Sequence, residues 1–128
     1  MEKTKEELFS QDINLHNEAD LMLRETGLGK IISEAGYKPV GSYAMRTMTW
    51  RDLDFERAQE PPNWNEHWTL GNNIFQLGFI WKFSCVDAYR DRRKAEKDSG
   101  FYWGLQFDYP NGGPLWKMDL WTARQSEW

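Results

Sequence analysis

Three segments with strand character follow one another in the second half of the chain, and they constrain its fold most. They are residues 82–90, 101–109 and 115–123, which are rich in aromatic and branched side chains. Turn-forming sequences separate them, Asp-Ser-Gly at 98–100 and Pro-Asn-Gly-Gly-Pro at 110–114. Because short connections of this kind join antiparallel neighbours, the sequence predicts a three-stranded antiparallel unit here.

The first half of the chain adds helices and two more strands. Helical patterns at 10–25 and 28–35 precede strand patterns at 38–42 and 52–57, and a third helix is expected from the cap Asn63 to about Gly78. This order predicts an α+β fold, with a mixed or antiparallel five-stranded sheet and helices packed on one face. We expect a single domain over 1–128, with the N-terminal helices in 1–37 and the sheet in 38–123.

Two carboxylates alternate with apolar residues in the segment Asp52-Leu53-Asp54-Phe55. In a strand, residues two apart project to the same face, so Asp52 and Asp54 share one face while Leu53 and Phe55 share the other. The apolar pair can then anchor the strand in a core. Two carboxylates on such a rigid support can bind hard cations.

Gly41 and Ser42 end the preceding strand pattern, and nine residues separate Ser42 from Asp52. Glycine adopts backbone angles that other residues avoid and allows close approach of a phosphate, and serine adds a hydroxyl donor. Residues 43–51 are long enough for a turn or a short helix whose first amides face an anion. The turn and the two acids together indicate a site for a nucleotide phosphate and its metal ions.

The run Val40-Gly41-Ser42, nine residues, then Asp52-Leu53-Asp54-Phe55 resembles the DNA polymerase β-like nucleotidyltransferase superfamily, and within it the small nucleotidyltransferase-domain proteins. The family places a third carboxylate on a later strand, and Asp119 is the residue that matches. Alternation in 115–121 puts Lys117, Asp119 and Trp121 on one face of that strand. The three acids and the lysine are therefore expected to converge.

The loop after Gly-Ser departs from the commonest bacterial form of the motif, in which a basic residue, alanine, a second basic residue and glycine follow. Ala44 agrees with that pattern. Tyr43 and Met45 replace the basic residues, and Arg46 replaces the glycine. The phosphate contacts of the family's loop therefore do not carry over to this one.

The resemblance implies a metal-dependent enzyme that moves a nucleoside monophosphate from a nucleoside triphosphate to a hydroxyl acceptor, which the sequence does not identify. Asp52 and Asp54 would hold two Mg²⁺ or Mn²⁺ ions, and Asp119 would be the third metal ligand or the base that takes the acceptor's proton. Gly41, Ser42 and Lys117 would bind the nucleotide.

Two alternatives stand beside this reading. One is a non-catalytic binding or regulatory module of the same fold, which the altered loop favours and the retention of three acids opposes. The other is an unrelated α+β domain in which the pattern is coincidental, and finding Asp52, Asp54 and Asp119 far apart would establish it.

Composition and charge add further expectations. A net charge of -4 and a pI near 5.2 argue against broad nucleic-acid binding, and the cation-rich run 90–97 is either a solvated loop or a phosphate clamp. Of the eight tryptophans, Trp103 and Trp116 are expected in the core, and Trp121 is the candidate for stacking on a base.

The lone Cys85 rules out a disulfide within the chain and is more typical of a buried strand residue than of a catalytic thiol. No apolar run is long enough to cross a membrane, and the charged N-terminus lacks the pattern of a signal peptide, so we expect a cytoplasmic protein. Because little sequence follows Ala123, we also expect a homodimer in which another subunit supplies the second wall of the cleft.

Overall fold

The computed structural model describes residues 2–61, 63–88, 90 and 100–124, so most of the cation-rich run 90–97 lies outside the described residues. The chain forms a five-stranded sheet covered by helices. In chain order the elements are α1 (Lys5–Thr26), α2 (Leu28–Glu34), β1 (Lys38–Val40), α3 (Gly41–Met45), β2 (Asp52–Ala58), α4 (Trp64–Phe75), β3 (Ile80–Asp87), β4 (Gly100–Asp108) and β5 (Leu115–Ala123).

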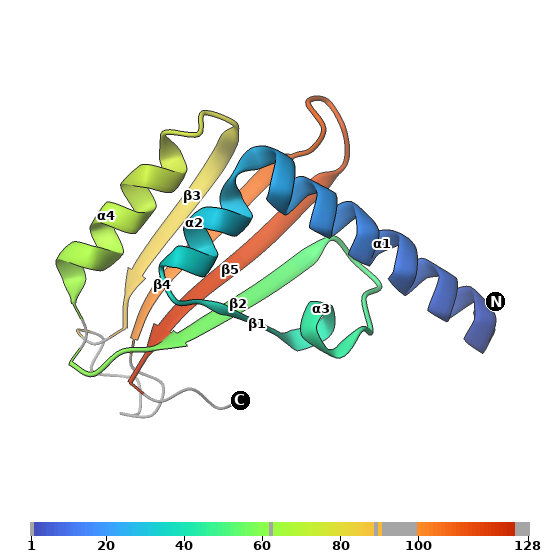
Figure 1. The fold of residues 1–128 in the computed structure, drawn as a ribbon, viewed down its shortest axis with the longest axis horizontal. Helices are drawn as coiled ribbons and strands as arrows, with labels where there is room; N and C mark the ends of the chain where they lie inside the picture. The colour runs from blue at the N-terminus through green and yellow to red at the C-terminus, as the bar shows by residue number, and fades with distance from the viewer. Residues whose placement is uncertain (1, 62, 89, 91–99, 125–128) are drawn as a thin grey trace.

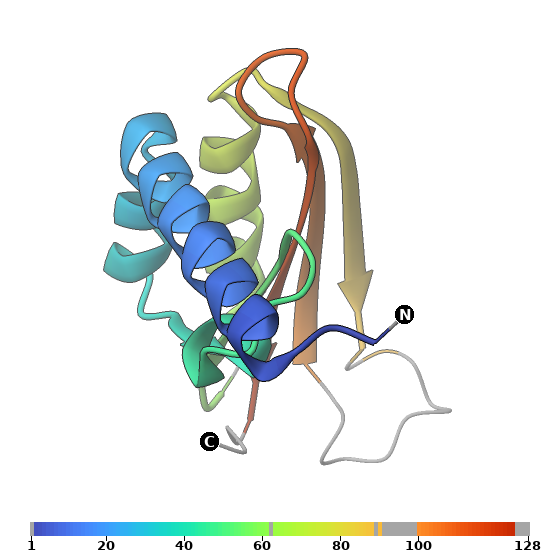
Figure 2. The same cartoon turned by 90° about the vertical axis from the view of Figure 1, so that its right-hand side faces the viewer.

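The strands are ordered β1-β2-β5-β4-β3, so the last strand of the chain lies at the centre of the sheet (Figure 1). The pairs β1–β2, β5–β4 and β4–β3 are antiparallel, whereas β2 and β5 are parallel. Figure 2 shows α1, α2 and α4 together on one side of the sheet. The predicted α+β class and the mixed five-stranded sheet with helices on one face are therefore confirmed.

Capping residues set the helix boundaries. Thr4 caps α1 by accepting a hydrogen bond from the Glu7 amide at 3.1 Å, so this helix begins at Lys5 and not near residue 10 as expected. It ends at Gly27, whose φ of 83° is left-handed. Asn63 caps α4 as predicted, by accepting from the Glu66 amide at 3.2 Å.

The strand expected over 38–42 is shorter in the structure, because β1 ends at Val40. Gly41 has a φ of 69° and therefore leaves the extended conformation. The five-residue helix α3 starts at this glycine and ends before Arg46, which is also left-handed. The expected turn or short helix after Gly-Ser thus begins two residues earlier, at the glycine itself.

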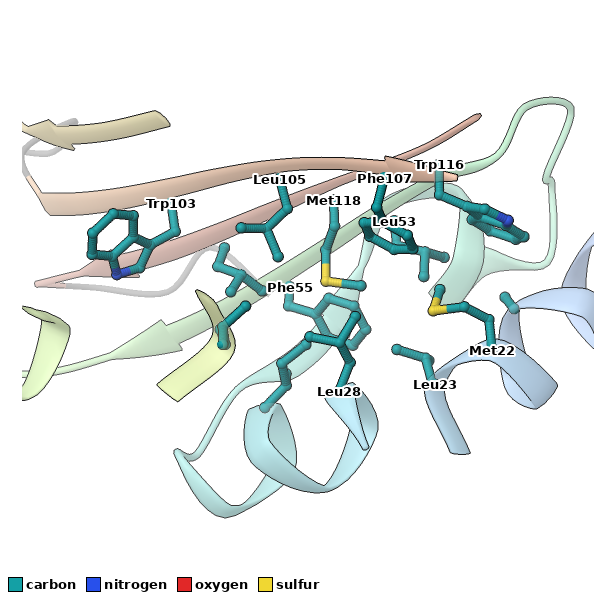
Figure 3. Close-up of a cluster of buried hydrophobic side chains, with 14 of the residues drawn as sticks. Met22, Leu23, Leu28, Leu53, Phe55, Trp103, Leu105, Phe107, Trp116 and Met118 are labelled. Atoms are coloured by element: carbon teal, nitrogen blue, oxygen red, sulfur yellow. The ribbon is translucent and has the colours of Figure 1, made fainter. Parts of the chain in front are cut away.

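The core lies between the sheet and the helices. Figure 3 shows Leu53 of β2, Leu105 of β4 and Met118 of β5 pointing toward Met22 and Leu28 of the helical layer. Trp103 and Trp116 are also buried there, as predicted. Burial in β2 and β5 alternates along each strand, so Leu53, Phe55, Met118 and Leu120 face the helices, whereas Asp52, Asp54 and Asp119 face away.

Cys85 corrects one expectation, because it is exposed and not buried. It lies on β3, the strand at one edge of the sheet, where cover on the helix side is incomplete. Among the described residues, no helix has the length and apolar character needed to span a bilayer.

Candidate functional site

The face of the sheet opposite the helices carries polar side chains in rows, which the strand register defines. Asp54 of β2 lies opposite Asp119 of β5, Asp119 lies opposite Gly104 of β4, and Gly104 lies opposite Ser84 of β3. Because register partners in neighbouring strands project to the same face, these four positions form one row across the sheet. We call it the acid row.

A second row, the lysine row, lies two residues away along the strands. It runs from Asp52 through Lys117 and Gln106 to Lys82. Two residues of strand correspond to about 7 Å, so the lysine row is a close neighbour of the acid row.

A third row lies on the other side of the acid row. It contains Glu56, Trp121, Tyr102 and Val86, again one from each of the four long strands. We call it the aromatic row, because Trp121 and Tyr102 pack against each other at its centre with ring centroids 4.8 Å apart.

The Asp54 and Asp119 carboxyl groups lie against each other on the open face. Burial raises the pKa of Asp54 to about 6, and the charges of Asp119 and Asp52 act in the same direction. Asp54 therefore holds its proton more tightly than an isolated aspartate does.

Asp52 lies beside this pair without joining it. Burial raises the pKa of Asp52, the charge of Asp119 adds to the effect, and the nearby Lys117 opposes it. Sequence reasoning expected three converging acids. The structure brings Asp54 and Asp119 into contact and leaves Asp52 one row away, within electrostatic reach.

Gly41 lies directly against the acid row. Val40 is the register partner of Asp54, and a Cβ placed on Gly41 would be 2.9 Å from Asp54 Oδ2. Two separate reasons therefore favour glycine at this position: the φ of 69° and the lack of room for a Cβ beside the carboxylate. Ser42, the next residue, lies in α3 and is partly buried.

Tyr102 fixes Asp119 from the other side of the acid row. Its hydroxyl donates a hydrogen bond to Asp119 Oδ1. The phenol ring crosses the position of Gly104, where any Cβ would collide with it, and rests on Trp121. Burial raises the pKa of Tyr102, as do the hydrogen bond and the charge of Asp119, so the phenol stays protonated and acts as a donor.

A hollow of about 350 Å³ opens on this face between the acid row and the lysine row. Two carboxylates, Asp52 and Asp119, and two ammonium groups, Lys82 and Lys117, contribute to its lining. The other polar lining residues are Ser84, Gln106 and Tyr102. The hollow thus places charges of both signs within a space large enough for a small polyanion with a bound metal ion.

The carboxylates of this region resemble a magnesium site in which the substrate supplies some of the metal ligands. Among the described residues, no three His, Cys, Asp or Glu side chains form a group that could hold a metal by themselves. Magnesium is usually held by one or two carboxylates together with substrate phosphates and water, and not by a cage made only of protein ligands. The Asp54–Asp119 pair, with Asp52 nearby, supplies such a partial set of hard oxygen ligands.

The predicted site residues therefore occupy one region of the open face or its border. Asp52, Asp54, Asp119 and Lys117 lie on two neighbouring strands, and Gly41 borders Asp54. Far separation of the three acids, which would have marked the pattern as coincidental, is not observed.

Sequence reasoning missed Tyr102, Gly104 and Lys82. Each lies on a predicted strand, but its relation to Asp119 depends on the register between strands. The alternation of Tyr102, Gly104 and Gln106 in β4 was the available signal, since it places them on the face opposite buried Trp103 and Leu105.

Neither a protein-family model nor a curated protein matches this sequence. The resemblance to nucleotidyltransferases therefore rests on the motif residues, and the arrangement of those residues on the open face is the basis for assigning a function.

Proposed function

We propose that this protein is a metal-dependent nucleotidyltransferase, which moves a nucleoside monophosphate from a nucleoside triphosphate to a hydroxyl acceptor. One observation carries the proposal: Asp54 and Asp119, from strands that are distant in the sequence, are register partners whose carboxyl groups lie against each other on the open face. Like charges held together cost stability, so their presence on a half-buried surface favours a functional role.

In the proposed reaction the acceptor oxygen attacks the α phosphorus. A bond forms between this oxygen and phosphorus, the bond from phosphorus to the oxygen that bridges to the β phosphate breaks, and pyrophosphate leaves. The proton of the acceptor hydroxyl passes to Asp119, which then acts as the base.

Mg²⁺ or Mn²⁺, when bound by Asp52 and Asp54, would supply charge neutralisation for the phosphates and activation of the acceptor, and Asp119 would be a third ligand if it were not the base. Tyr102 holds Asp119 in its orientation toward Asp54. Lys117, next to Asp52, would bind the phosphates through its positive charge. We assign phosphate binding also to Ser42 and the backbone at Gly41, which offer neutral hydrogen-bond donors.

A non-catalytic module of the same fold is the second candidate. The observation that favours it is the contact of Gly41 with Asp54, because the glycine is then explained by the fold without any phosphate. Such a module would bind a nucleotide, or only a protein partner, and would not catalyse nucleotidyl transfer.

Thermal unfolding with each nucleoside triphosphate, with and without Mg²⁺ or Mn²⁺, tests the proposal. A ligand at a hundred times its Kd stabilises a protein by about 2.7 kcal/mol, which is a clear melting shift. We expect a metal-dependent shift in wild type that is lost in Asp54→Asn. Asp108→Asn is the matched control, because it makes the same chemical change at an exposed position at the end of β4.

Turnover is measured separately, as metal-dependent pyrophosphate release in the presence of a panel of hydroxyl acceptors. A metal-dependent shift with release would support the enzyme, whereas a shift without release from any acceptor would support the module. No shift with any triphosphate would overturn nucleotide binding altogether.

We also propose that the protein is a homodimer. Light scattering that gives the mass of a single 15.2 kDa chain at high protein concentration would contradict this.

A further inference from the structure

The lysine row has a feature that the proposed roles of the acids do not explain, namely two ammonium groups, of which Lys117 lies near Asp52 but neither forms a salt bridge with a described carboxylate. In the part of the chain that the structure describes, the salt bridges within 4.0 Å include neither Lys82 nor Lys117. Both side chains line the same hollow as Asp119. Two such cations that line one hollow favour a ligand that brings its own negative charge.

The mixed lining of the hollow restricts what that ligand can be. A bare anion would be attracted by Lys82 and Lys117 but repelled by Asp52 and Asp119, while a bare cation would meet the reverse. A metal–polyphosphate complex matches both the acids and the lysines of the lining, because its metal faces the acids and its outer phosphates face the lysines.

The dimensions agree with this ligand. Lys117 and Lys82 lie on strands separated by β4, so their backbones are about 10 Å apart, and the lysine row is about 7 Å from the acid row. Gln106 lies between the two lysines, and Ser84 lies on the acid row next to Gly104. The amide and the hydroxyl add neutral hydrogen-bond donors to the floor of the hollow.

We propose that the hollow between Lys82 and Lys117 is a polyphosphate subsite, in which the β and γ phosphates of the nucleotide lie over β4 and β3 with Lys82 as their distal cation. This deepens the proposed function, on which it rests, and adds Lys82, Gln106 and Ser84 to the nucleotide-binding residues.

The border of the acid row at Gly41, on the side away from the hollow, is less suited to the β and γ phosphates. There the Gly41 backbone packs against Asp54. The side chains of Tyr43 and Met45 in the short helix α3 carry no charge, and Arg46 follows only at the end of that helix. The Gly41–Ser42 turn can contact the α phosphate beside Asp54. The hollow, in contrast, combines two cations with free volume.

This placement also orients the rest of the nucleotide. With the β and γ phosphates at the lysine row and the α phosphate at the acid row, the nucleoside extends toward the aromatic row. Trp121 lies there, 37% exposed, and its ring can stack on a base.

Calorimetric titration with inorganic tripolyphosphate, in the presence and absence of Mg²⁺, tests the subsite without any nucleoside. We expect binding that requires Mg²⁺ and that weakens at least tenfold in Lys82→Met. Lys30→Met is the matched control: it removes one positive charge from an exposed position on α2, in the helical layer, and should leave the affinity unchanged.

A Trp121→Leu variant adds a test of orientation, because it should weaken nucleoside triphosphate binding severalfold and leave tripolyphosphate binding unchanged. Equal tripolyphosphate affinity in wild type, Lys82→Met and Lys30→Met would overturn the subsite, even if Asp54-dependent nucleotide binding is found. Conversely, tripolyphosphate binding that depends on Lys82, together with no nucleotide transfer, would uphold the subsite and overturn the enzyme.

Discussion

Two polar clusters lie on the same pair of parallel strands, three residues apart, and they differ in almost every physical respect. On the helix side, Arg57 of β2 faces its register partner Thr122 of β5. Its Nε donates to Thr122 Oγ1 and its Nη1 to the Ala35 carbonyl, both at 2.8 Å, and its guanidinium lies 4.7 Å from the centre of the Tyr37 ring. On the open side, Asp54 faces Asp119.

The comparison shows how burial and charge distinguish structure from function. The Arg57 cluster is buried and places one charge among neutral acceptors and an aromatic ring, so it stabilises the packing of α2 on the sheet. The Asp54–Asp119 pair is half-buried and places two like charges together, an arrangement that favours proton or metal binding over stability. The following substitutions test this distinction.

The largest effect is expected from Arg57→Met. The variant leaves the Ala35 carbonyl without its donor and removes one of the two side-chain partners of Thr122 Oγ1, which keeps the Tyr37 hydroxyl. The loss of two hydrogen bonds from a buried charged group predicts a decrease of about 3 kcal/mol in the free energy of unfolding. Chemical denaturation measures it. Arg51→Met is the control, because it breaks the half-exposed salt bridge to Glu18 and should cost less than about 1 kcal/mol. Equal costs for the two variants would show that the Arg57 cluster is not a structural element.

Asp54→Asn is expected to act in the opposite direction. The folded protein binds the Asp54 proton more tightly than the unfolded chain, since its pKa is about 6 instead of 3.8. Wild type therefore loses stability as the pH rises from about 4 to about 6. After discounting for solvent screening of a half-exposed group, the amide should stabilise the fold by about 1 kcal/mol at pH 7 and by nothing below pH 4.

The measurement is the free energy of unfolding as a function of pH. Asp108→Asn should show the wild-type pH dependence. Destabilisation at pH 7 by Asp54→Asn would mean that the carboxylate is held in a favourable structural hydrogen-bond network, like that of Arg57.

A smaller change in stability, with a diagnostic change in titration, is expected from Tyr102→Phe. Without the phenol donor, the charge of Asp119 is less well stabilised and repels ionised Asp54 more strongly, so the pKa of Asp54 should rise above 6. Stability should fall by about 1 kcal/mol or less. Carboxyl chemical shifts recorded by NMR against pH give the pKa directly. Tyr109→Phe, which removes a tyrosine–Glu25 hydrogen bond elsewhere, should not move it.

The smallest effect on stability is expected from Gly104→Ala. The added Cβ displaces the Tyr102 ring from its path to Asp119. Loss of this contact destabilises the fold, whereas alanine lowers the conformational entropy of the unfolded chain and so stabilises the fold. The two effects oppose each other, and the free energy of unfolding should change by less than about 0.5 kcal/mol. The Asp54 titration should nevertheless shift as in Tyr102→Phe. An unchanged titration would show that Gly104 is there for packing alone.

Much of the fold could be predicted from the sequence, because alternation and turn residues act locally. The strand 115–123 was predicted with its observed boundaries, and the caps and breaks at Asn63 and Gly27 were recognised from side-chain chemistry. The division of β2 and β5 into an apolar and a polar face followed from a period of two residues.

What could not be predicted depends on contacts between distant segments. Alternation shows that Asp54 and Asp119 each face away from the core, but only the parallel register between β2 and β5 makes them partners. The positions of Tyr102 and Lys82 relative to Asp119 depend on two further registers. Such registers are fixed by packing against the helices, which local sequence does not specify.

The central position of β5 has a consequence for how the protein is made. Sixty-five positions of sequence separate Asp54 from Asp119, and β5 must insert between β2 and β4 after every other strand has been synthesised (Figure 1). Loop closure of this length is slow compared with the formation of hairpins. A chain that lacks residues 115–123 lacks both Lys117 and Asp119, so the acid row and the hollow are complete only once β5 lies between β2 and β4.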